Sequence, residues 1–250
     1  MVEMEWAADA MVFLAIFVIV LIIYLFIKRV FFKQPRYDFE YTLPNGMKIG
    51  NSQLIGEKDS QNDCFTITEK DGLLFSAIAD GMTDKPIGKY AASEVINVFK
   101  NNFLNGRYRK VGVKRFFEES IRLSQKNLHN NASGNKTGAM IAAVLVKDGE
   151  LHYLSLGSCS IFLLRAGELI YINNIENHEI QMNKVKLAPK DIVLLCSSGA
   201  GNSLTERELL WHLSEANHPY GKCQDLLKLI RQKRLVNQDN ATIIIMEQMV

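Results

Sequence analysis

The sequence has 250 residues, of which 48% are hydrophobic and 22% are charged, and this is the composition of a chain that folds around a core. Such a composition excludes a disordered chain and a collagen-like repeat. Its 29 Lys and Arg residues against 27 Asp and Glu residues leave a net charge of +2, so the chain lacks the large positive field that attracts nucleic acid. We therefore expect no nucleic-acid partner.

The first feature along the chain is an apolar run over residues 10–27, without a charged residue, a glycine or a proline. As a helix it would span about 27 Å, which is close to the hydrocarbon thickness of a bilayer. A buried helix of this length in a soluble protein would show a polar face, and this run has none. The run therefore predicts a transmembrane helix over residues 10–30, followed by a globular domain.

The charges on either side of the run predict its orientation. Acidic residues precede it and basic residues follow it: Glu3, Glu5 and Asp9, then Lys28, Arg29, Lys33 and Arg36. The positive-inside rule then predicts a single-pass protein of the cell membrane, with residues 1–9 as a short tail outside and the domain in the cytoplasm. A cleaved signal peptide would begin with basic residues, so cleavage is not expected. Residues 31–46 predict a short juxtamembrane connector, and residues 47–250 the globular domain.

Hydrophobic patterns predict the elements of this domain in chain order. Strands are expected at residues 48–55, 64–69, 73–79, 139–146, 151–156, 160–164, 169–172, 192–196 and 241–247. Helices are expected at residues 86–103, 113–130, 205–214 and 223–235. The four strands within residues 139–172 are joined by turns that contain glycine, which indicates an antiparallel meander. Strands, a helix pair, more strands and then helices indicate an α+β layered fold.

Acidic residues stand at the ends of three of these apolar strands. Asp63 comes just before one strand, Asp80-Gly81 ends another, and Asp239 leads into the last. An aspartate followed by glycine can offer a cation both a carboxylate and an accessible main-chain carbonyl. Alone, an aspartate at a strand end is more often a turn or capping residue than a metal ligand.

Taken together, these segments resemble the motifs of the protein phosphatase 2C family, the PPM type, from about residue 47 to residue 247. The motifs agree with the family in order and spacing, at residues 78–82, 137–139, 156–167, 191–199 and 238–242. The resemblance implies a four-layer αββα sandwich of two antiparallel sheets. The stretch of residues 172–190 is shorter than the family's usual flap. In this respect the chain is similar to compact bacterial members of the family that act on regulatory phosphoproteins.

The resemblance also implies a metal-dependent phosphatase. In the family two Mn²⁺ or Mg²⁺ ions activate a bridging water that attacks phosphoserine or phosphothreonine, and such hard cations prefer oxygen ligands. By position, Asp80 would bridge the metals, the Gly81 carbonyl would bind one ion and Asp239 the other, and Asp63 would hold a coordinated water. Asp63, Asp80 and Asp239 are thus the expected catalytic residues, and Lys58 stands at the position of the family's phosphate-binding arginine.

Several positions depart from the family pattern. Ser198 stands where the family has an aspartate ligand of the second metal, Asn62 where it has a glutamate, and Ser158 where it has a further aspartate. The binding of divalent cations should weaken, because carboxylates supply the negative charge that compensates the cations. A water molecule or Asp84 would replace one of the lost ligands. Lys58 is also a point charge without the bidentate fork of an arginine.

Two functions follow, and the sequence leaves both open. The first is a membrane-tethered serine/threonine phosphatase that hydrolyses a phosphorylated protein or serves a Ser/Thr kinase partner in signalling. The second is a pseudophosphatase that keeps the sandwich as a regulatory or binding module because metal ligands are lost at Ser198 and Asn62.

Overall fold

The computed structural model describes residues 46–83, 86–131, 137–174 and 179–249, and near the N-terminus the five helical residues Leu14, Phe17, Val18, Val20 and Leu21. The rest of the predicted tail, transmembrane helix and connector, residues 1–45, lies outside the described residues, as does Asp84. No helix within the described residues is long and apolar enough to cross a membrane. The transmembrane helix and the domain boundaries therefore stay predictions. Residues 1–38 and 39–250 form separate units, and the second is described below.

Two five-stranded antiparallel sheets form the centre of the described domain. The first contains β1 (Met47–Leu54), β6 (Ser160–Arg165), β7 (Glu168–Tyr171), β9 (Ile192–Cys196) and β10 (Ala241–Gln248), in the order β1-β10-β9-β6-β7. The second contains β2 (Asp63–Lys70), β3 (Leu73–Gly81), β4 (Ala139–Lys147), β5 (Glu150–Leu156) and β8 (Gln181–Lys186), in the order β2-β3-β4-β5-β8. Neighbouring strands within both sheets pair antiparallel.

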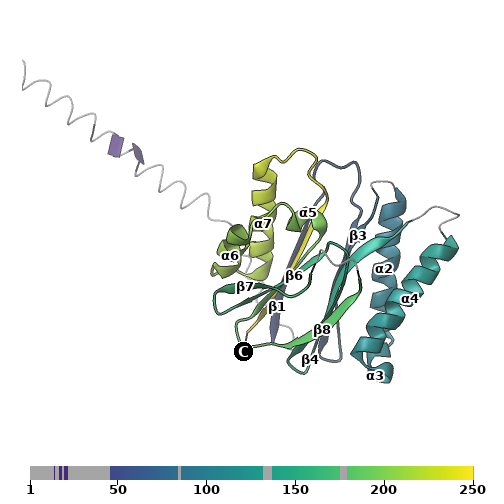
Figure 1. Ribbon diagram of the computed structural model, residues 1–250. Helices are drawn as coiled ribbons and strands as arrows, with labels where there is room; N and C mark the ends of the chain where they lie inside the picture. Colours follow the sequence, from purple (N-terminus) through teal and green to yellow (C-terminus); the bar gives the residue numbers. More distant parts are fainter. Residues whose placement is uncertain are drawn as a thin grey trace, which may run out of the picture. The chain divides into compact units, whose positions relative to one another are not determined.

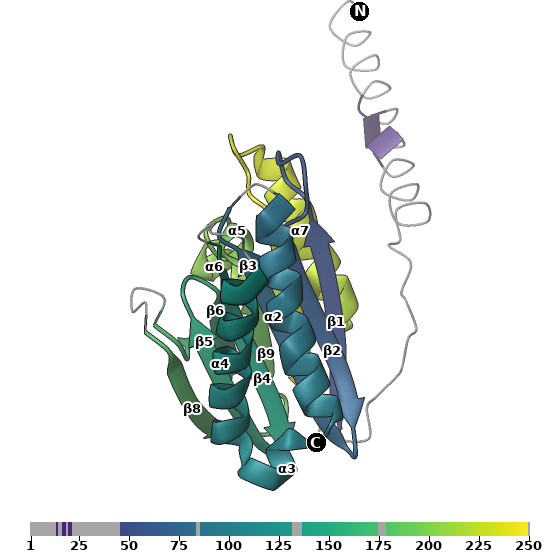
Figure 2. The same cartoon turned by 90° about the vertical axis from the view of Figure 1, so that its right-hand side faces the viewer.

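Helices cover the outer face of each sheet (Figures 1 and 2). Against the second sheet lie α2 (Pro86–Leu104), α3 (Arg107–Val111) and α4 (Val113–Asn131). Against the first lie α5 (Ser198–Gly201), α6 (Glu206–Ser214) and α7 (Pro219–Lys233). The expected four-layer αββα sandwich is therefore confirmed.

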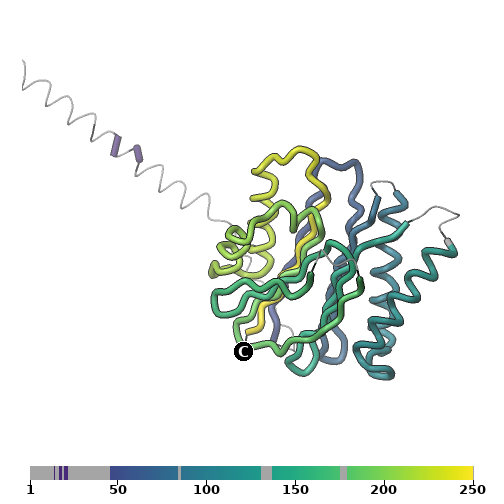
Figure 3. Tube along the Cα trace, in the orientation of Figure 1, coloured from purple at the N-terminus to yellow at the C-terminus, as the bar shows by residue number. Residues whose placement is uncertain are grey.

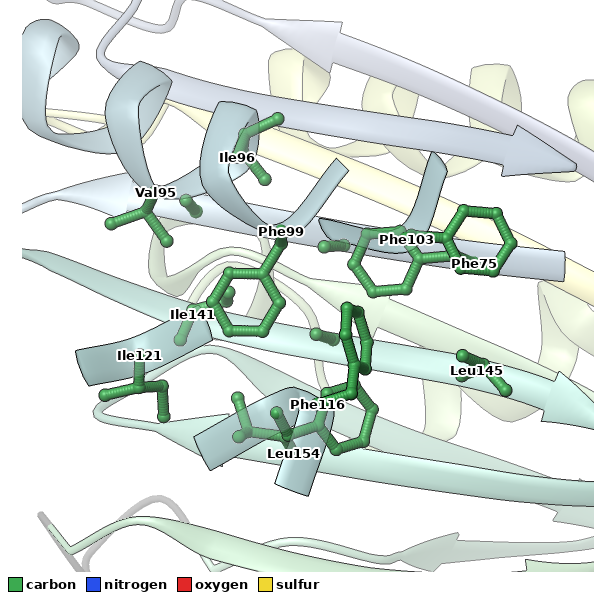
Figure 4. Close-up of a cluster of buried hydrophobic side chains, with 14 of the residues drawn as sticks. Phe75, Val95, Ile96, Phe99, Phe103, Phe116, Ile121, Ile141, Leu145 and Leu154 are labelled. Carbon is green, nitrogen blue, oxygen red and sulfur yellow. The ribbon is translucent and has the colours of Figure 1, made fainter. Parts of the chain in front are cut away.

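Three buried apolar layers hold the four layers together. The layer under α2 and α4 is the most aromatic, and Figure 4 shows its side chains pointing toward one another. Phe75 of β3 stacks on Phe103 at a ring-centroid distance of 5.4 Å and meets the edge of Phe116 at 5.9 Å. Aromatic rings prefer such offset and edge-to-face contacts, which contribute beyond the area that they bury.

The expected meander is wrong, because β5 and β6 belong to different sheets. The chain leaves the second sheet after β5 through Gly157, whose φ of 84° suits glycine, and enters the first sheet with β6. Five of the six residues of β6 are buried. A strand buried on both faces carries no period-two signal, so a hairpin and a crossover look alike in sequence.

Some elements were missed or misplaced. The strand β8 at the edge of its sheet is half-exposed and polar, so it shows no hydrophobic alternation. The last helix begins at Pro219 rather than residue 223, and its cap is the ring of His218, whose Nδ1 accepts the Tyr220 N–H at 3.2 Å. Proline at the first helical position is a start signal that the apolar pattern alone overlooked.

Loops from distant parts of the sequence meet at one end of the sandwich. Figure 3 shows the loop after β1 and the loop before β10 at the same end of the domain. They are joined by a hydrogen bond of 2.8 Å from the Glu57 N–H to the Gln238 carbonyl. This arrangement brings the predicted site segments together.

Candidate functional site

Two buried aspartates form the centre of the site. Asp63 begins β2 and Asp80 lies near the end of β3, and the antiparallel register places them directly opposite each other. They are only 3% and 8% exposed, respectively. Burial, and next the nearby Asp80 carboxylate, raise the pKa of Asp63 to about 7, although hydrogen bonds from Thr242 and Ser197 act in the opposite direction. The strand ends thus hold a pair of carboxyl groups that resist simultaneous ionisation.

One oxygen of Asp63 is satisfied and the other is not. The Thr242 hydroxyl donates to Asp63 Oδ2 at 2.6 Å, and Gln53 Nε2 donates to the same threonine oxygen at 3.0 Å. Asp63 Oδ1 is buried and has no hydrogen-bond partner among the described residues. A buried polar atom without a partner is costly, so this oxygen is available to a water or to a water bound to a cation.

Ser198 binds Asp80 directly. The Ser198 N–H donates to Asp80 Oδ2 at 3.3 Å, and the Ser198 hydroxyl donates to the same oxygen. The next residue, Gly199, lies closely against the loop before β10, because an added Cβ would stand 2.0 Å from the Asn240 carbonyl oxygen. The position where the resemblance expects an acidic metal ligand therefore holds a neutral donor that satisfies Asp80.

Asp239 lies at the rim of the site. Its side chain is 49% exposed, and the Lys58 ammonium lies 3.8 Å from its Oδ1. The same oxygen accepts the Asn240 N–H at 2.8 Å. The lysine that the sequence assigned to phosphate thus contacts a predicted metal ligand.

Asn62 and Asn240 tie the loops of the site together. Asn62 donates its side-chain amide to the Thr83 carbonyl at 3.0 Å, and its N–H donates to Asn240 Oδ1 at 2.7 Å. Asn240 Nδ2 reaches the carbonyls of Ile55 at 2.7 Å and Ser60 at 3.0 Å. Both asparagines are at most 4% exposed. The neutral residue at position 62 is therefore a structural link between three loops.

The remaining predicted positions, Ser158 and Gly81, lie beside this centre. The Ser158 hydroxyl contacts Met140 Sδ at 2.9 Å, and Met140 pairs with Asp80 across β3 and β4. A Cβ on Gly81 would stand 2.3 Å from the Gly88 carbonyl oxygen, so glycine at position 81 lets the end of β3 approach α2 closely.

The donor set fits one divalent cation better than two. Asp80, and the unpartnered oxygen of Asp63 as an acceptor for bound water, are the hard oxygen donors that Mg²⁺ and Mn²⁺ prefer, and the resemblance adds the Gly81 carbonyl. The second metal of the family does not fit, because Ser198 is neutral and Asp239 contacts Lys58. In the described part of the chain no three His, Cys, Asp or Glu side chains gather closely enough to hold a metal ion.

Comparison with solved structures identifies this architecture. The serine/threonine phosphatase PstP/Ppp of Mycobacterium tuberculosis matches with a TM-score of 0.70 and 16% identity over 82% of this chain and 99% of that chain. The S. agalactiae serine/threonine phosphatase matches with a TM-score of 0.69 and 17% identity over 80% of this chain and 98% of that chain. RsbX in complex with magnesium matches with a TM-score of 0.61 and 19% identity over 80% of this chain and 94% of that chain.

The chain has the fold of the PPM-type serine/threonine phosphatases. No family model matches the sequence, and no curated protein matches it either. At these identities the similarity shows the fold, and the PPM fold predicted from the motifs is confirmed.

Sequence reasoning found the two central aspartates and Ser198 but missed the residues that hold them. Ser197 and Thr242 lie within the motifs at residues 191–199 and 238–242, but the motifs assign no role to either residue. The signal was present, because Thr242 lies two positions after Asn240 and would share its side of the last strand. Its partner Gln53 comes from β1 and becomes visible only when β1 pairs with β10.

Proposed function

We propose that this chain is a membrane-tethered pseudophosphatase, a PPM-type module that binds phosphoserine- or phosphothreonine-containing proteins in kinase signalling without hydrolysing them at an appreciable rate. The tether is the predicted helix of residues 10–30, with the N-terminus outside and the domain in the cytoplasm. The observation that carries the proposal is the hydrogen bond of Ser198 to Asp80, because it puts a neutral donor where a second metal would need a carboxylate.

The residues that remain favour binding of a phosphate group. Lys58 lies at the rim with a side chain that is 23% exposed and supplies a positive charge for a phosphate oxygen. A divalent cation held by Asp80 and the Gly81 carbonyl would supply further charge for the phosphate when bound. The carboxylates of Asp63 and Asp80 would orient the water around it. Without the second metal, neither the attacking nor the leaving oxygen gains the paired stabilisation that hydrolysis requires.

The test uses the full chain in detergent micelles with Mn²⁺, a phosphothreonine peptide and an aryl phosphate. We expect peptide binding without release of phosphate. Ser198→Asp should raise phosphate release, because it restores the missing carboxylate, whereas the matched control Ser214→Asp, on an exposed position of α6, should not.

A metal-dependent phosphatase is the second candidate, and the unpartnered buried oxygen of Asp63 favours it because that oxygen suits a cation-bound water. This candidate predicts Mn²⁺-dependent phosphate release by the natural chain, abolished by Asp80→Asn and by Asp239→Asn. That result would replace the pseudophosphatase proposal.

A further inference from the structure

A polar groove of about 360 Å³ runs from Asp63 along the outer side of β2. We call it the β2 groove and define it by residues of β2 and of the facing side of α2, namely Asp63, Phe65, Thr66, Lys89, Asn97 and Lys100. Figure 2 shows α2 and β2 on the same side of the domain. The groove shares Asp63 with the candidate site and leads away from it.

The strand and the helix run in the same direction along the groove. At the Asp63 end, Lys89 lines the groove together with Asp63 and Cys64 at the start of β2. At the other end, the Lys70 ammonium donates to the Leu104 carbonyl, which joins the last residues of both elements. The groove therefore has a site end near Lys89 and a distal end toward Lys100.

β2 is the first strand of its sheet, so its outer edge has no strand partner within that sheet. The Asp63 N–H donates to Gln61 Oε1 at 3.0 Å, and the Asp63 carbonyl accepts Gln53 Nε2 at 3.5 Å, so this residue turns its backbone away from β3. Backbone direction alternates in an antiparallel ladder, and Phe65 therefore turns its N–H and carbonyl outward as well. The two glutamines occupy the outward backbone groups of Asp63, so the edge that an extended peptide can join as a strand begins at Phe65.

The charges on the helix side indicate which peptide fits. Lys89 and Lys100 are exposed, and neither forms an ion pair within the described residues. Eleven helical positions separate them by about 16 Å, which equals about five residues of an extended chain. Among the described residues that line the groove, Asp63 at its end is the one acidic side chain. An extended segment with acidic side chains five residues apart would match both lysines.

We propose that the β2 groove docks an extended acidic segment of a phosphoprotein partner as an added strand on β2, and that the segment leads a phosphorylated residue to the Asp63 end. The place of the phosphorylated residue rests on the function proposed above. Docking of the acidic segment depends only on the groove.

The test measures fluorescence anisotropy of labelled ten-residue peptides on the full chain in detergent micelles. One peptide carries two glutamates five residues apart, and a second adds a phosphothreonine at its site end. The double variant Lys89→Glu with Lys100→Glu should weaken binding of both peptides about 10-fold. The matched control Lys126→Glu, exposed on α4 outside the groove, should leave the affinity unchanged. An equal loss in the control, or no loss in the double variant, would overturn the proposal.

The backbone contact is tested on the peptide, which avoids any effect on folding. N-methylation of alternate amides should abolish binding in one register and leave it unchanged in the other, because only one set of amides faces the strand. Equal binding of both methylated peptides would exclude strand addition. If the unphosphorylated peptide binds through the groove and phosphorylation adds no affinity, the docking proposal stands and the proposed phosphate-binding function fails.

Discussion

Replacement of Ser198 by aspartate should make the stability of the domain depend on a divalent cation. In the natural chain the Ser198 hydroxyl and N–H both donate to Asp80 Oδ2. A hydrogen bond to a charged group contributes about 1.5–3 kcal/mol. Ser198→Asp loses the hydroxyl donor and adds a third carboxyl group beside Asp63 and Asp80. Like charges about 4 Å apart repel by up to about 4 kcal/mol at an effective dielectric constant of about 20.

Protonation of one carboxyl group relieves part of this repulsion, since the pKa of Asp63 is already raised to about 7. We therefore expect Ser198→Asp to lower the free energy of unfolding by about 3 kcal/mol in EDTA. Mn²⁺ at a thousand times its dissociation constant would restore about 4 kcal/mol.

The assay is urea unfolding of the full chain in detergent micelles, followed by tryptophan fluorescence in EDTA and in Mn²⁺. Ser198→Asn is the matched control, because it has the same shape as aspartate but adds no charge and therefore no carboxylate ligand for the cation. It should show a small loss of stability that Mn²⁺ does not restore beyond the response of the natural chain. If Mn²⁺ stabilises Ser198→Asp no more than it stabilises Ser198→Asn, position 198 does not face a cation site and the assignment of the lost ligand is wrong.

Two further predictions concern the elements that hold the site. Gly199→Ala should lower the free energy of unfolding by about 3 kcal/mol, because the added Cβ would stand 2.0 Å from a backbone oxygen. In the control Gly201→Ala the added Cβ meets a side-chain oxygen at 3.1 Å, so the loss of stability in the same urea assay should be less than half as large. Glu208→Gln keeps the capping box of α6 but removes the negative charge beside Lys233. Hydrogen bonds from Lys233 and from Thr205 lower the pKa of Glu208 to about 2. A depressed pKa stabilises the fold at pH values above the unfolded pKa of 4.5. The natural chain should therefore be more stable than Glu208→Gln by about 1 kcal/mol at pH 7, a value reduced because the side chain is partly exposed to solvent. This difference in stability should fall as the pH drops from 4.5 toward 2. A difference that stays constant down to pH 3 would contradict the assignment.

The strands and most of the helices were predictable because their evidence is local, and the sandwich followed from the resemblance of the motifs to the PPM type. The order of the motifs predicts the PPM fold, and the ends of most strands lie within two residues of the expected positions. The exceptions share a physical cause. The polar edge strand β8 and the capped start of α7 depend on pairing and capping, which a hydrophobic pattern does not record. The change of sheet after β5 depends on which faces other layers cover.

The site divides in the same way. Asp63, Asp80 and Ser198 could be placed from their motifs, because a motif describes one strand end and its loop. The hydrogen bonds that decide their chemistry cross between strands far apart in sequence, as from Thr242 to Asp63, whose positions differ by 179. No local pattern reports such a contact. Asn62 was read as a lost acid, and only the folded chain reveals it as a link to Asn240.

The neutral substitutions are consistent with one another when they are considered as charge compensation. A two-metal centre gathers several carboxylates at one end of a sandwich, and the cations are what make that cluster stable. In this chain the hydroxyl of Ser198 satisfies Asp80, the hydroxyl of Thr242 satisfies one oxygen of Asp63, and Asn62 joins the loops by neutral hydrogen bonds. Each of these contacts does without a cation. A site end that is held together by hydrogen bonds can keep its shape with no second metal, which is the property that the proposed binding module needs.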